Sequence, residues 1–225
     1  LKESVSISLW PSLAQVISTA LIGYGLSRFR FRFKGLILFL ILFTFIIPAQ
    51  VLMIPTYLLY KDLGILGDIQ VFILPAMFGQ GIKSTIFIMI FYQFFNMIPR
   101  ELDEAAMVDG AGPLRVFLQI AVPLVIPAAI VVFLFSFVWY WNETYLTSLY
   151  IPEARTLPIQ LSRFAASFRE IYGNQNENMD SVTDRLNEAI YMAGTLISIL
   201  PLLLLYFALQ RWFVEGIDRS GITGA

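Results

Sequence analysis

Five long apolar runs occupy most of this sequence, and they constrain the fold more than any other feature. A bilayer core about 30 Å thick is crossed by a helix of roughly 20 apolar residues. Of the 225 residues, 58% are hydrophobic and only 14% are charged, and the mean hydropathy is +0.74. We therefore predict an all-α, polytopic transmembrane helix bundle that forms a single domain over residues 1–225, with spans at 4–26, 35–60, 71–97, 124–145 and 189–213.

Prolines and glycines interrupt the second and third runs. Pro48 and Pro55 lie inside the second run, where each removes a backbone hydrogen bond and is expected to kink a helix. The third run contains Pro75 and the sequence Gly-Gln-Gly at 79–81, and Lys83 follows. This pattern fits either one kinked helix or two short ones. Lys83 is then either a pathway residue or a snorkelling side chain at a break, and the glycines beside it favour the break.

The basic segment 28–34 sets the orientation, because it contains four Lys or Arg residues and no acid. Short loops rich in Lys and Arg stay on the cytoplasmic side. Counting spans from there puts the polar segment 98–123 inside and the polar segment 149–188 outside. Residue 1 then starts outside, so we expect one further helix to precede it in a multi-pass protein of the cytoplasmic membrane. The basic side chains also suit anionic lipid headgroups, although topology alone accounts for them.

The composition removes several kinds of chemistry. The sequence has no Cys and no His, which excludes thiol chemistry, imidazole catalysis, disulfides and His or Cys metal sites. A net charge of -1 offers no basic surface for nucleic acid. No Gly-x-x-x-x-Gly-Lys-Ser/Thr phosphate loop occurs, so any ATP that drives this protein is bound by a partner. We predict no cofactor, metal or catalytic residue in this chain.

The compact polar segment 98–123 carries the strongest functional signal. Pro99 suits a first helical turn, acids at 101, 103 and 104 complement the helix dipole, and Gly110 suits the end of the helix. A second helix at 113–122, leading into the fourth span, is expected to bury a stripe and to expose a polar side. The stripe is Leu114, Phe117, Leu118 and Ala121, and the polar side is Arg115 and Gln119. From spacing alone, the segment is equally an ordinary solvated loop whose acids cap a helix.

The same segment resembles the cytoplasmic signature of permease subunits of binding-protein-dependent ABC importers. That signature is Glu-Ala-Ala, three residues, Gly, nine residues and Ile-x-x-Pro, and it matches Glu104, Ala105, Ala106, Gly110, Ile120 and Pro123. Val122 stands where the family usually has Leu. Further segments resemble the carbohydrate-uptake branch, the maltose-type permeases: 24–29, 98–102, 109–111, 141–143, 156–158 and 210–216.

The resemblance implies a six-helix permease fold with a coupling helix that docks on an ATP-binding subunit and passes its closure to the membrane helices. It assigns this coupling to Glu104, Ala105, Ala106, Asp109, Gly110, Arg115, Ile120 and Pro123. The implied partners are a dimer of ATP-binding subunits that holds ATP and Mg²⁺, a second and different permease subunit, an extracytoplasmic solute-binding protein and membrane lipid. The implied solute is a sugar or oligosaccharide. Residues 169–187 are longer than the family pattern suggests, and the tail 221–225 lacks its frequent Lys-Gly ending.

A sugar pathway needs aromatic faces for C–H groups and polar tips for hydroxyls. Residues of both kinds lie in or beside the spans: Gln50, Tyr57, Gln80, Trp139, Asn142, Glu143 and Tyr145. Each also has a structural interpretation, as part of an interface belt, as a helix end or as a hydrogen bond between helices. Three other functions remain open: import of another polar solute, a membrane-embedded enzyme that uses Glu143, and a secondary transporter driven by an ion gradient.

Overall fold

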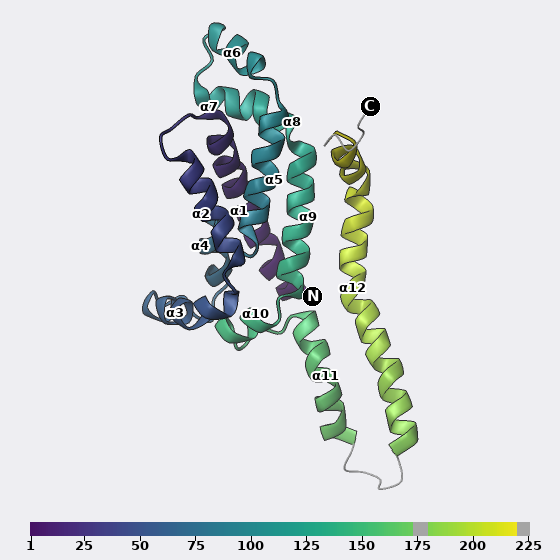
Figure 1. Ribbon diagram of the computed structural model, residues 1–225. Coiled ribbons are helices and arrows are strands. Elements are labelled where there is room, and N and C mark those ends of the chain that lie inside the picture. Colours follow the sequence, from purple (N-terminus) through teal and green to yellow (C-terminus); the bar gives the residue numbers. More distant parts are fainter. Residues whose placement is uncertain (173–179, 220–225) are drawn as a thin grey trace.

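The computed structural model describes residues 1–172 and 180–219, with side chains described at 1–48, 50–164 and 188–212. The described residues form helices and no strand, which confirms the all-α prediction (Figure 1). The elements are α1 (Lys2–Arg28), α2 (Lys34–Ile46), α3 (Ala49–Asp62), α4 (Gln70–Met77), α5 (Ser84–Met97), α6 (Arg100–Val108), α7 (Pro113–Val116), the π-helical turn η1 (Phe117–Ala121), α8 (Val122–Leu124), α9 (Ile126–Asn142), α10 (Tyr145–Tyr150), α11 (Leu157–Tyr172) and α12 (Asp180–Arg219).

Helix α1 lies at the centre of the bundle and packs against α4, α5 and α9. Gly23 lets α5 come so close that a Cβ there would lie 2.6 Å from the Cβ of Phe91. Buried polar side chains of α1 are hydrogen-bonded, as a membrane interior requires. Gln15 makes three bonds to distant segments: its amide donates to Ile82 O (2.7 Å) and Ser84 Oγ (2.9 Å) and accepts from Ser136 Oγ (2.8 Å). The amide thus ties α1 to α5 and α9.

The second apolar run folds as two helices, α2 and α3, whose axes differ by 99°. The break falls at Pro48, the cap of α3, which has extended backbone and no N–H to continue α2. Pro55 lies inside α3 without breaking it, so only one of the two expected kinks is found. Helix α2, all of whose residues are described, has no buried side chain. It contacts α5, where the Thr44 and Thr85 hydroxyls hydrogen-bond at 3.0 Å.

The third apolar run is also two helices, α4 and α5, which settles the choice between one kinked helix and two short ones. Residues 78–83 separate them, and Gly79 and Lys83 have positive φ of 71° and 58°. Lys83 therefore lies at the break, as expected. Its ammonium nitrogen is 5.5 Å from the centre of the Phe45 ring on α2, a cation–π contact.

The remaining helices build the other end of the bundle and the last span. Helix α9 leads into the short α10. Helix α11 then leaves the body and runs beside the first part of α12, so that the two project from the bundle (Figure 1). The described residues of the polar segment 149–188, which was expected as an outer loop, are therefore largely helical. Two features singled out in the sequence, the Asn-rich stretch at 173–178 and the tail at 221–225, lie outside the described residues.

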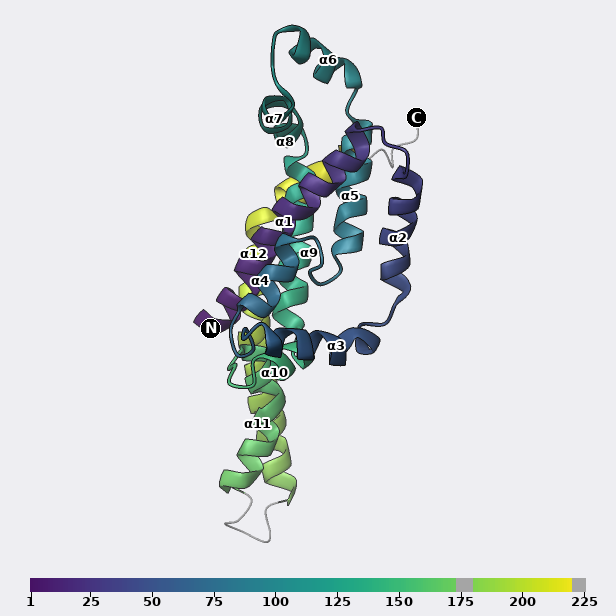
Figure 2. The same ribbon diagram turned by 90° about the vertical axis from the view of Figure 1, so that its left-hand side faces the viewer.

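The two ends of the molecule carry different elements. The basic segment 28–34, α6 and α7 lie at one end, and α3 and α10 lie at the other (Figures 1 and 2). This placement agrees with the orientation drawn from the basic segment. Among the described residues, 2 helices are long and apolar enough to cross a membrane alone, Lys2–Arg28 and Glu188–Trp212, and counting each of 2 bent pairs as one span gives up to 4. The five spans stay a prediction.

Candidate functional site

The polar segment 98–123 forms two short helices that turn back on each other. Helix α6 begins after Pro99, which is its N-cap, and carries Glu101 and Asp103 in its first turn. It ends at Gly110, whose φ of 83° reverses the chain. The N–H of Ala111 donates to Ala106 O (2.9 Å) and that of Gly110 to Met107 O (3.0 Å), which is the Schellman pattern. The predicted helix end at Gly110 is confirmed.

Helix α6 presents most of its side chains outward. Asp103 is its only buried residue among those described, whereas Glu104 and Ala105 are exposed and Ala106 is half-buried. Val108 is 88% exposed, and Leu102 and Met107 are also open. An exposed surface that mixes apolar side chains with a carboxylate is typical of a protein contact site. The expected smooth patch at Ala105 and Ala106 therefore lies on an accessible face.

The return segment α7–η1 packs on the ends of two membrane helices. Phe117 is buried, with its ring centre 4.8 Å from that of Tyr24 on α1 and 6.4 Å from that of Phe95 on α5. Val116 and Ala121 are buried beside it. Rings at these separations attract each other beyond the area they bury. The return segment is thus anchored to the bundle, and α6 lies beyond the end of the bundle.

The expected apolar stripe of this segment is half wrong. Phe117 and Ala121 are buried as predicted, but Leu114 and Leu118 are 68% and 54% exposed, and Val116 is buried in their place. The physical reason lies in the turn itself. Residues 117–121 form a π-turn, so the α-helical spacing does not continue through them. The two leucines face outward and enlarge the open apolar surface at this end.

A shallow hollow of about 180 Å³ lies between α6 and the return segment. Its lining brings together four of the predicted coupling residues, Ala106, Asp109, Arg115 and Ile120, with Ala111 and Gln119. Arg115 Nε donates to Gln119 Oε1 at 2.8 Å, which confirms that these two residues share one side of the segment. A second hollow beside it is lined by Gly112, Pro113, Leu114, Arg115, Leu118 and Gln119. Glu104, Ala105 and Gly110 lie near these hollows on α6 and its end, outside both linings.

The return segment meets the fourth span at a sharp bend. Residues 113–124 and α9 are inclined by 74°, and the change of direction falls at Val125, which has φ −101° and ψ 9°. Pro123 and Pro127 flank it, and neither has an N–H to continue a helix across the bend. Pro123 is exposed and belongs to α8, before the bend. The expected lever between the polar segment and the fourth span is present as a bent pair of helices.

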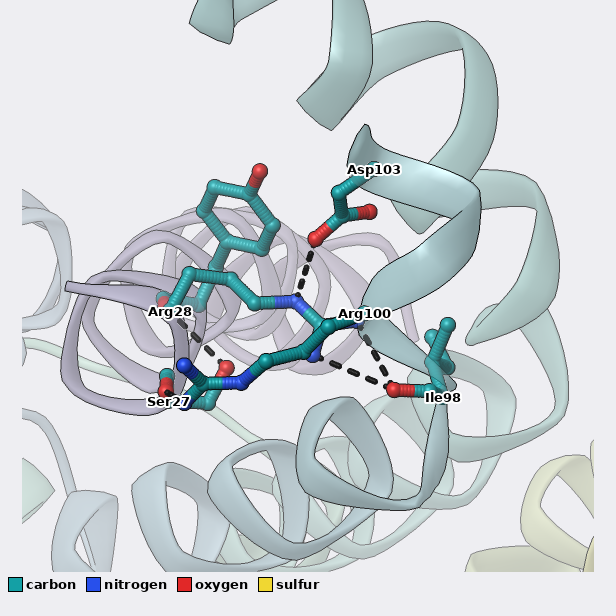
Figure 3. Close-up of polar contacts among 6 residues, drawn as sticks. Ser27, Arg28, Ile98, Arg100 and Asp103 are labelled. Carbon is teal, nitrogen blue, oxygen red and sulfur yellow. Dashed lines mark hydrogen bonds and ion pairs between the residues drawn. The ribbon is translucent and has the colours of Figure 1, made fainter. Parts of the chain in front are cut away.

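An ion pair that the sequence patterns do not identify joins α6 to α1 (Figure 3). Arg28 Nε and Asp103 Oδ2 are 2.8 Å apart, and both side chains are buried. The Arg28 guanidinium also donates two hydrogen bonds to Ile98 O, at 3.1 and 3.2 Å. Arg100 Nη2 donates to Ser27 O at 3.3 Å. The sequence indicates this pair only weakly, because it shows two opposite charges in segments expected on the same side of the membrane.

The seven residues proposed for a solute pathway are spread over three places. Gln50 and Tyr57 are on α3, Gln80 is exposed in the 78–83 connection, and the other four lie along α9 and α10. Trp139 packs on Phe87, with ring centres 5.4 Å apart. Tyr145 is 59% exposed. Neither hollow contains any of the seven, and their pathway role stays a prediction.

The Asn-Glu pair at the end of α9 has local partners. Asn142 Nδ2 donates to Val138 O at 2.9 Å. Glu143 Oε1 accepts the N–H of Leu146 at 2.9 Å, in the first turn of α10. A carboxylate in this position caps the following helix. The geometry therefore supports the structural interpretation of this pair as a helix-end motif.

Several known proteins are similar to this chain. Residues 17–219 match the family model described as "Binding-protein-dependent transport system inner membrane component". The chain is 34% identical over 227 residues to the maltodextrin transport system permease protein MdxG of Bacillus subtilis, covering 99% of this chain and 74% of that protein. It is 32% identical over 224 residues to the polygalacturonan/rhamnogalacturonan transport system permease protein YtcP of the same species, covering 98% and 75%.

Two further similarities extend this picture. The lactose transport system permease protein LacG of Rhizobium radiobacter is 30% identical over 221 residues, which cover 97% of this chain and 73% of that protein. The fold is similar to that in the crystal structure of a bacterial ABC transporter involved in the import of the acidic polysaccharide alginate. The TM-score is 0.67 at 23% identity, covering 94% of this chain and 74% of that chain.

Proposed function

The chain belongs to the family of binding-protein-dependent transport system inner membrane components, and from this premise we propose that it is a permease subunit of an ATP-driven importer of a sugar or oligosaccharide. The proposed solute class rests on the names of its relatives. They describe permease proteins for maltodextrin, lactose and polygalacturonan or rhamnogalacturonan. These solutes differ in size and charge and share only their carbohydrate nature, so the class is carried over without choosing one sugar.

The proposed partners supply what this chain lacks. The sequence has no phosphate loop, so a dimer of ATP-binding subunits on the cytoplasmic side binds ATP and Mg²⁺. A solute-binding protein delivers the sugar to the opposite face. A second, different permease subunit completes the pathway. The chain itself breaks no bond, and its contribution is the change of conformation that exposes the pathway to each side in turn.

The observation that supports the coupling role best is the exposed end formed by α6 and the return segment. Its surface contains Glu104, Ala105 and the lining of the hollow between α6 and η1. Phe117 anchors this end to α1 and α5, and the bend at Val125 connects it to α9. ATP-driven closure of the partner shifts α6, and the shift reaches the membrane helices through these contacts.

The assignment is tested in the complete importer, reconstituted with its ATPase and binding protein. Gly110→Arg places a bulky cation at a positive-φ position, and Glu104→Lys reverses an exposed charge on the docking face. Both variants are expected to insert normally and to lose ATP-driven uptake. Gly112→Ala is the matched control, because Gly112 has an ordinary φ of −71° and open space around its Cβ position. Normal uptake with Gly110→Arg and Glu104→Lys, and with the ATPase still bound, would show that this end does not couple.

The solute class needs a separate experiment. Uptake of labelled maltodextrin, lactose and galacturonate oligomers is measured in the same proteoliposomes, with amino acids and small peptides as competitors. ATP-dependent uptake of one of the carbohydrates is expected. Preferential uptake of a non-carbohydrate solute would contradict the sugar assignment. Uptake on an ion gradient without ATP would contradict the ATP-driven mechanism.

A further inference from the structure

We propose that Arg28 and Asp103 form a charged joint that transmits the movement of α6 directly to α1, in addition to the path through the return segment and α9. The inference rests on the proposed coupling function of α6. It assigns positioning roles to two residues outside the Glu-Ala-Ala signature, one in the basic segment and one in the first turn of α6. Movement of α6 would then reach the membrane helices by two paths, one through α1 and one through the return segment and α9.

The burial of the pair is the first observation. Asp103 is the only buried side chain of α6 among the described residues, while its neighbours Leu102 and Glu104 are exposed. The side chains of Arg28 and Asp103 are 7% and 8% exposed. A charge is placed in such surroundings only when an opposite charge compensates it. The one buried side chain of α6 among the described residues is therefore held by α1.

The hydrogen bonds around the pair cross between three elements. Arg28, the last residue of α1, donates to Ile98 O, which is the C-cap of α5. Arg100, the first residue of α6, donates in the opposite direction to Ser27 O on α1. The dashed lines in Figure 3 join Arg28 to Asp103 and Ile98, and join Arg100 to Ser27. Any displacement of the first turn of α6 must carry the end of α1 with it or break these contacts.

Charge, more than hydrogen-bond alignment, holds the ion pair. Arg28 Nε and Asp103 Oδ2 are in close contact, yet neither Arg28 Nε nor Asp103 Oδ1 has a hydrogen-bond partner among the described residues. Asparagine has nearly the same shape as aspartate but no charge. Asp103→Asn therefore removes the attraction while leaving the volume of the side chain in place.

Helix α1 leads from this joint to the middle of the membrane region. Its face toward α4, α5 and α9 contains Gln15, which donates to Ile82 O and Ser84 Oγ. Ile82 lies in the 78–83 break, two residues after the exposed Gln80, and Ser84 is the first residue of α5. A shift of α1 thus reaches the break between α4 and α5 through hydrogen bonds. The joint connects the cytoplasmic end to one of the places proposed for the solute pathway.

The first test compares Asp103→Asn, Arg28→Gln and the swapped double variant Arg28→Asp with Asp103→Arg. Each is assembled with the wild-type partners, and ATP hydrolysed per solute imported is measured together with binding of the ATPase. The single variants are expected to bind the ATPase and to raise ATP used per solute by roughly tenfold or more, since a buried charge loses its partner. The double variant is expected to recover most of the coupling. Glu101→Gln and Arg30→Gln, exposed charges in the same two segments, are the controls.

The second test does not depend on these variants assembling. The sequence has no Cys, so Arg30→Cys and Glu101→Cys give one label on each side of the joint. The distance between the labels is measured through the ATP cycle in the otherwise wild-type complex. The joint predicts a constant distance while α6 moves relative to the opposite end of the molecule. A distance that changes with ATP would overturn the proposal.

The outcomes separate this inference from the coupling function on which it rests. If Gly110→Arg abolishes uptake but Asp103→Asn keeps normal ATP use per solute, α6 couples and the charged joint does not. If Gly110→Arg and Glu104→Lys leave uptake unchanged, the coupling function itself fails. A label distance that changes with ATP would overturn the joint whatever the swapped variant does.

Discussion

Asp103 and Glu143 are two carboxylates at opposite ends of the molecule, and they differ in how far along the chain their partners lie. Glu143 accepts the N–H of Leu146, three residues on, and so stabilises the start of its own next helix. Asp103 pairs with Arg28, which belongs to a different helix. A local contact fixes a turn whatever the rest of the protein does. A contact between distant segments makes two elements move together.

This difference predicts how much each contact contributes to stability and to transport. Removing a partner from a distant, buried contact leaves a polar group without compensation. Removing a local cap exposes a backbone N–H that water can reach at a helix end. The expected loss of stability therefore falls from Asp103 through Gln15 and Glu143 to the exposed Leu118.

Asp103→Ala is expected to destabilise the assembled subunit most, by about 3–5 kcal/mol, because Arg28 stays buried without its counter-ion. The measurement is the thermal unfolding midpoint of the purified complex. Glu101→Ala, an exposed acid two positions earlier on α6, should change stability by less than about 0.5 kcal/mol. Equal effects of the two variants would show that the buried pair has no special weight.

Gln15→Leu is expected to cost about 1–3 kcal/mol, since it leaves Ser84, Ser136 and Ile82 O without their amide partner. The Gln15 contacts, like that of Asp103, join segments far apart along the chain, but Gln15 carries no charge. The difference in stability loss between the two variants therefore measures the contribution of charge. Gln93→Leu, at an exposed position of α5, is the control. A loss as large as that of Asp103→Ala would mean that distance along the chain, not charge, decides the effect.

Glu143→Ala is expected to cost about 1 kcal/mol, the usual value of a lost helix cap. Transport should stay within about twofold of wild type if the carboxylate only caps α10. Uptake and thermal unfolding are measured on the same preparation, with Glu143→Gln as the variant that retains an acceptor. A large loss of uptake in a stable protein would instead assign Glu143 to the solute pathway.

Leu118→Ala is expected to change stability by less than about 0.5 kcal/mol, because the side chain is 54% exposed and touches little of its own chain. Its effect should fall on binding of the ATPase, which is measured by titration. Leu52→Ala, a leucine that is 52% exposed on α3 at the other end, is the matched control. Weaker ATPase binding by Leu118→Ala alone would mark the return segment as part of the docking surface.

Local chemistry made part of this structure predictable from the sequence. Gly110 ends α6 because only a residue that tolerates positive φ fits there, and Pro48 breaks the second run because it has no N–H. Pro55 has the same chemistry but stays inside α3, so a proline alone does not fix where a kink falls. The return segment shows the same limit. Helical spacing predicted that Leu114 and Phe117 lie on the same side of one helix. The structure has a π-turn at 117–121, which has no sequence signature of its own, and it leaves Leu114 exposed and Phe117 buried.

Contacts between distant segments were the part that could not be predicted. In the sequence, Arg28 is one of four basic residues that together predict the topology. The residues beside Arg28 do not distinguish it from Arg30. Only the fold, which brings Asp103 of α6 to the end of α1, shows that the Arg28 side chain is buried and that Arg30 is exposed. In the same way, Gln15 is a single amide in a run of small and aliphatic residues, and only the fold brings the 78–83 break beside it.

Helix α2, which has no buried side chain, also bears on how this protein is made. A membrane helix inserts as an independent unit and finds its neighbours afterwards. Since α2 contacts α5 and turns by 99° into α3 at Pro48, we expect its final place to be fixed late in biogenesis, when lipid or the proposed second subunit covers it. Subunits synthesised without a partner would therefore differ from assembled ones first at residues 46–49, where cleavage by a membrane protease reports whether assembly is complete.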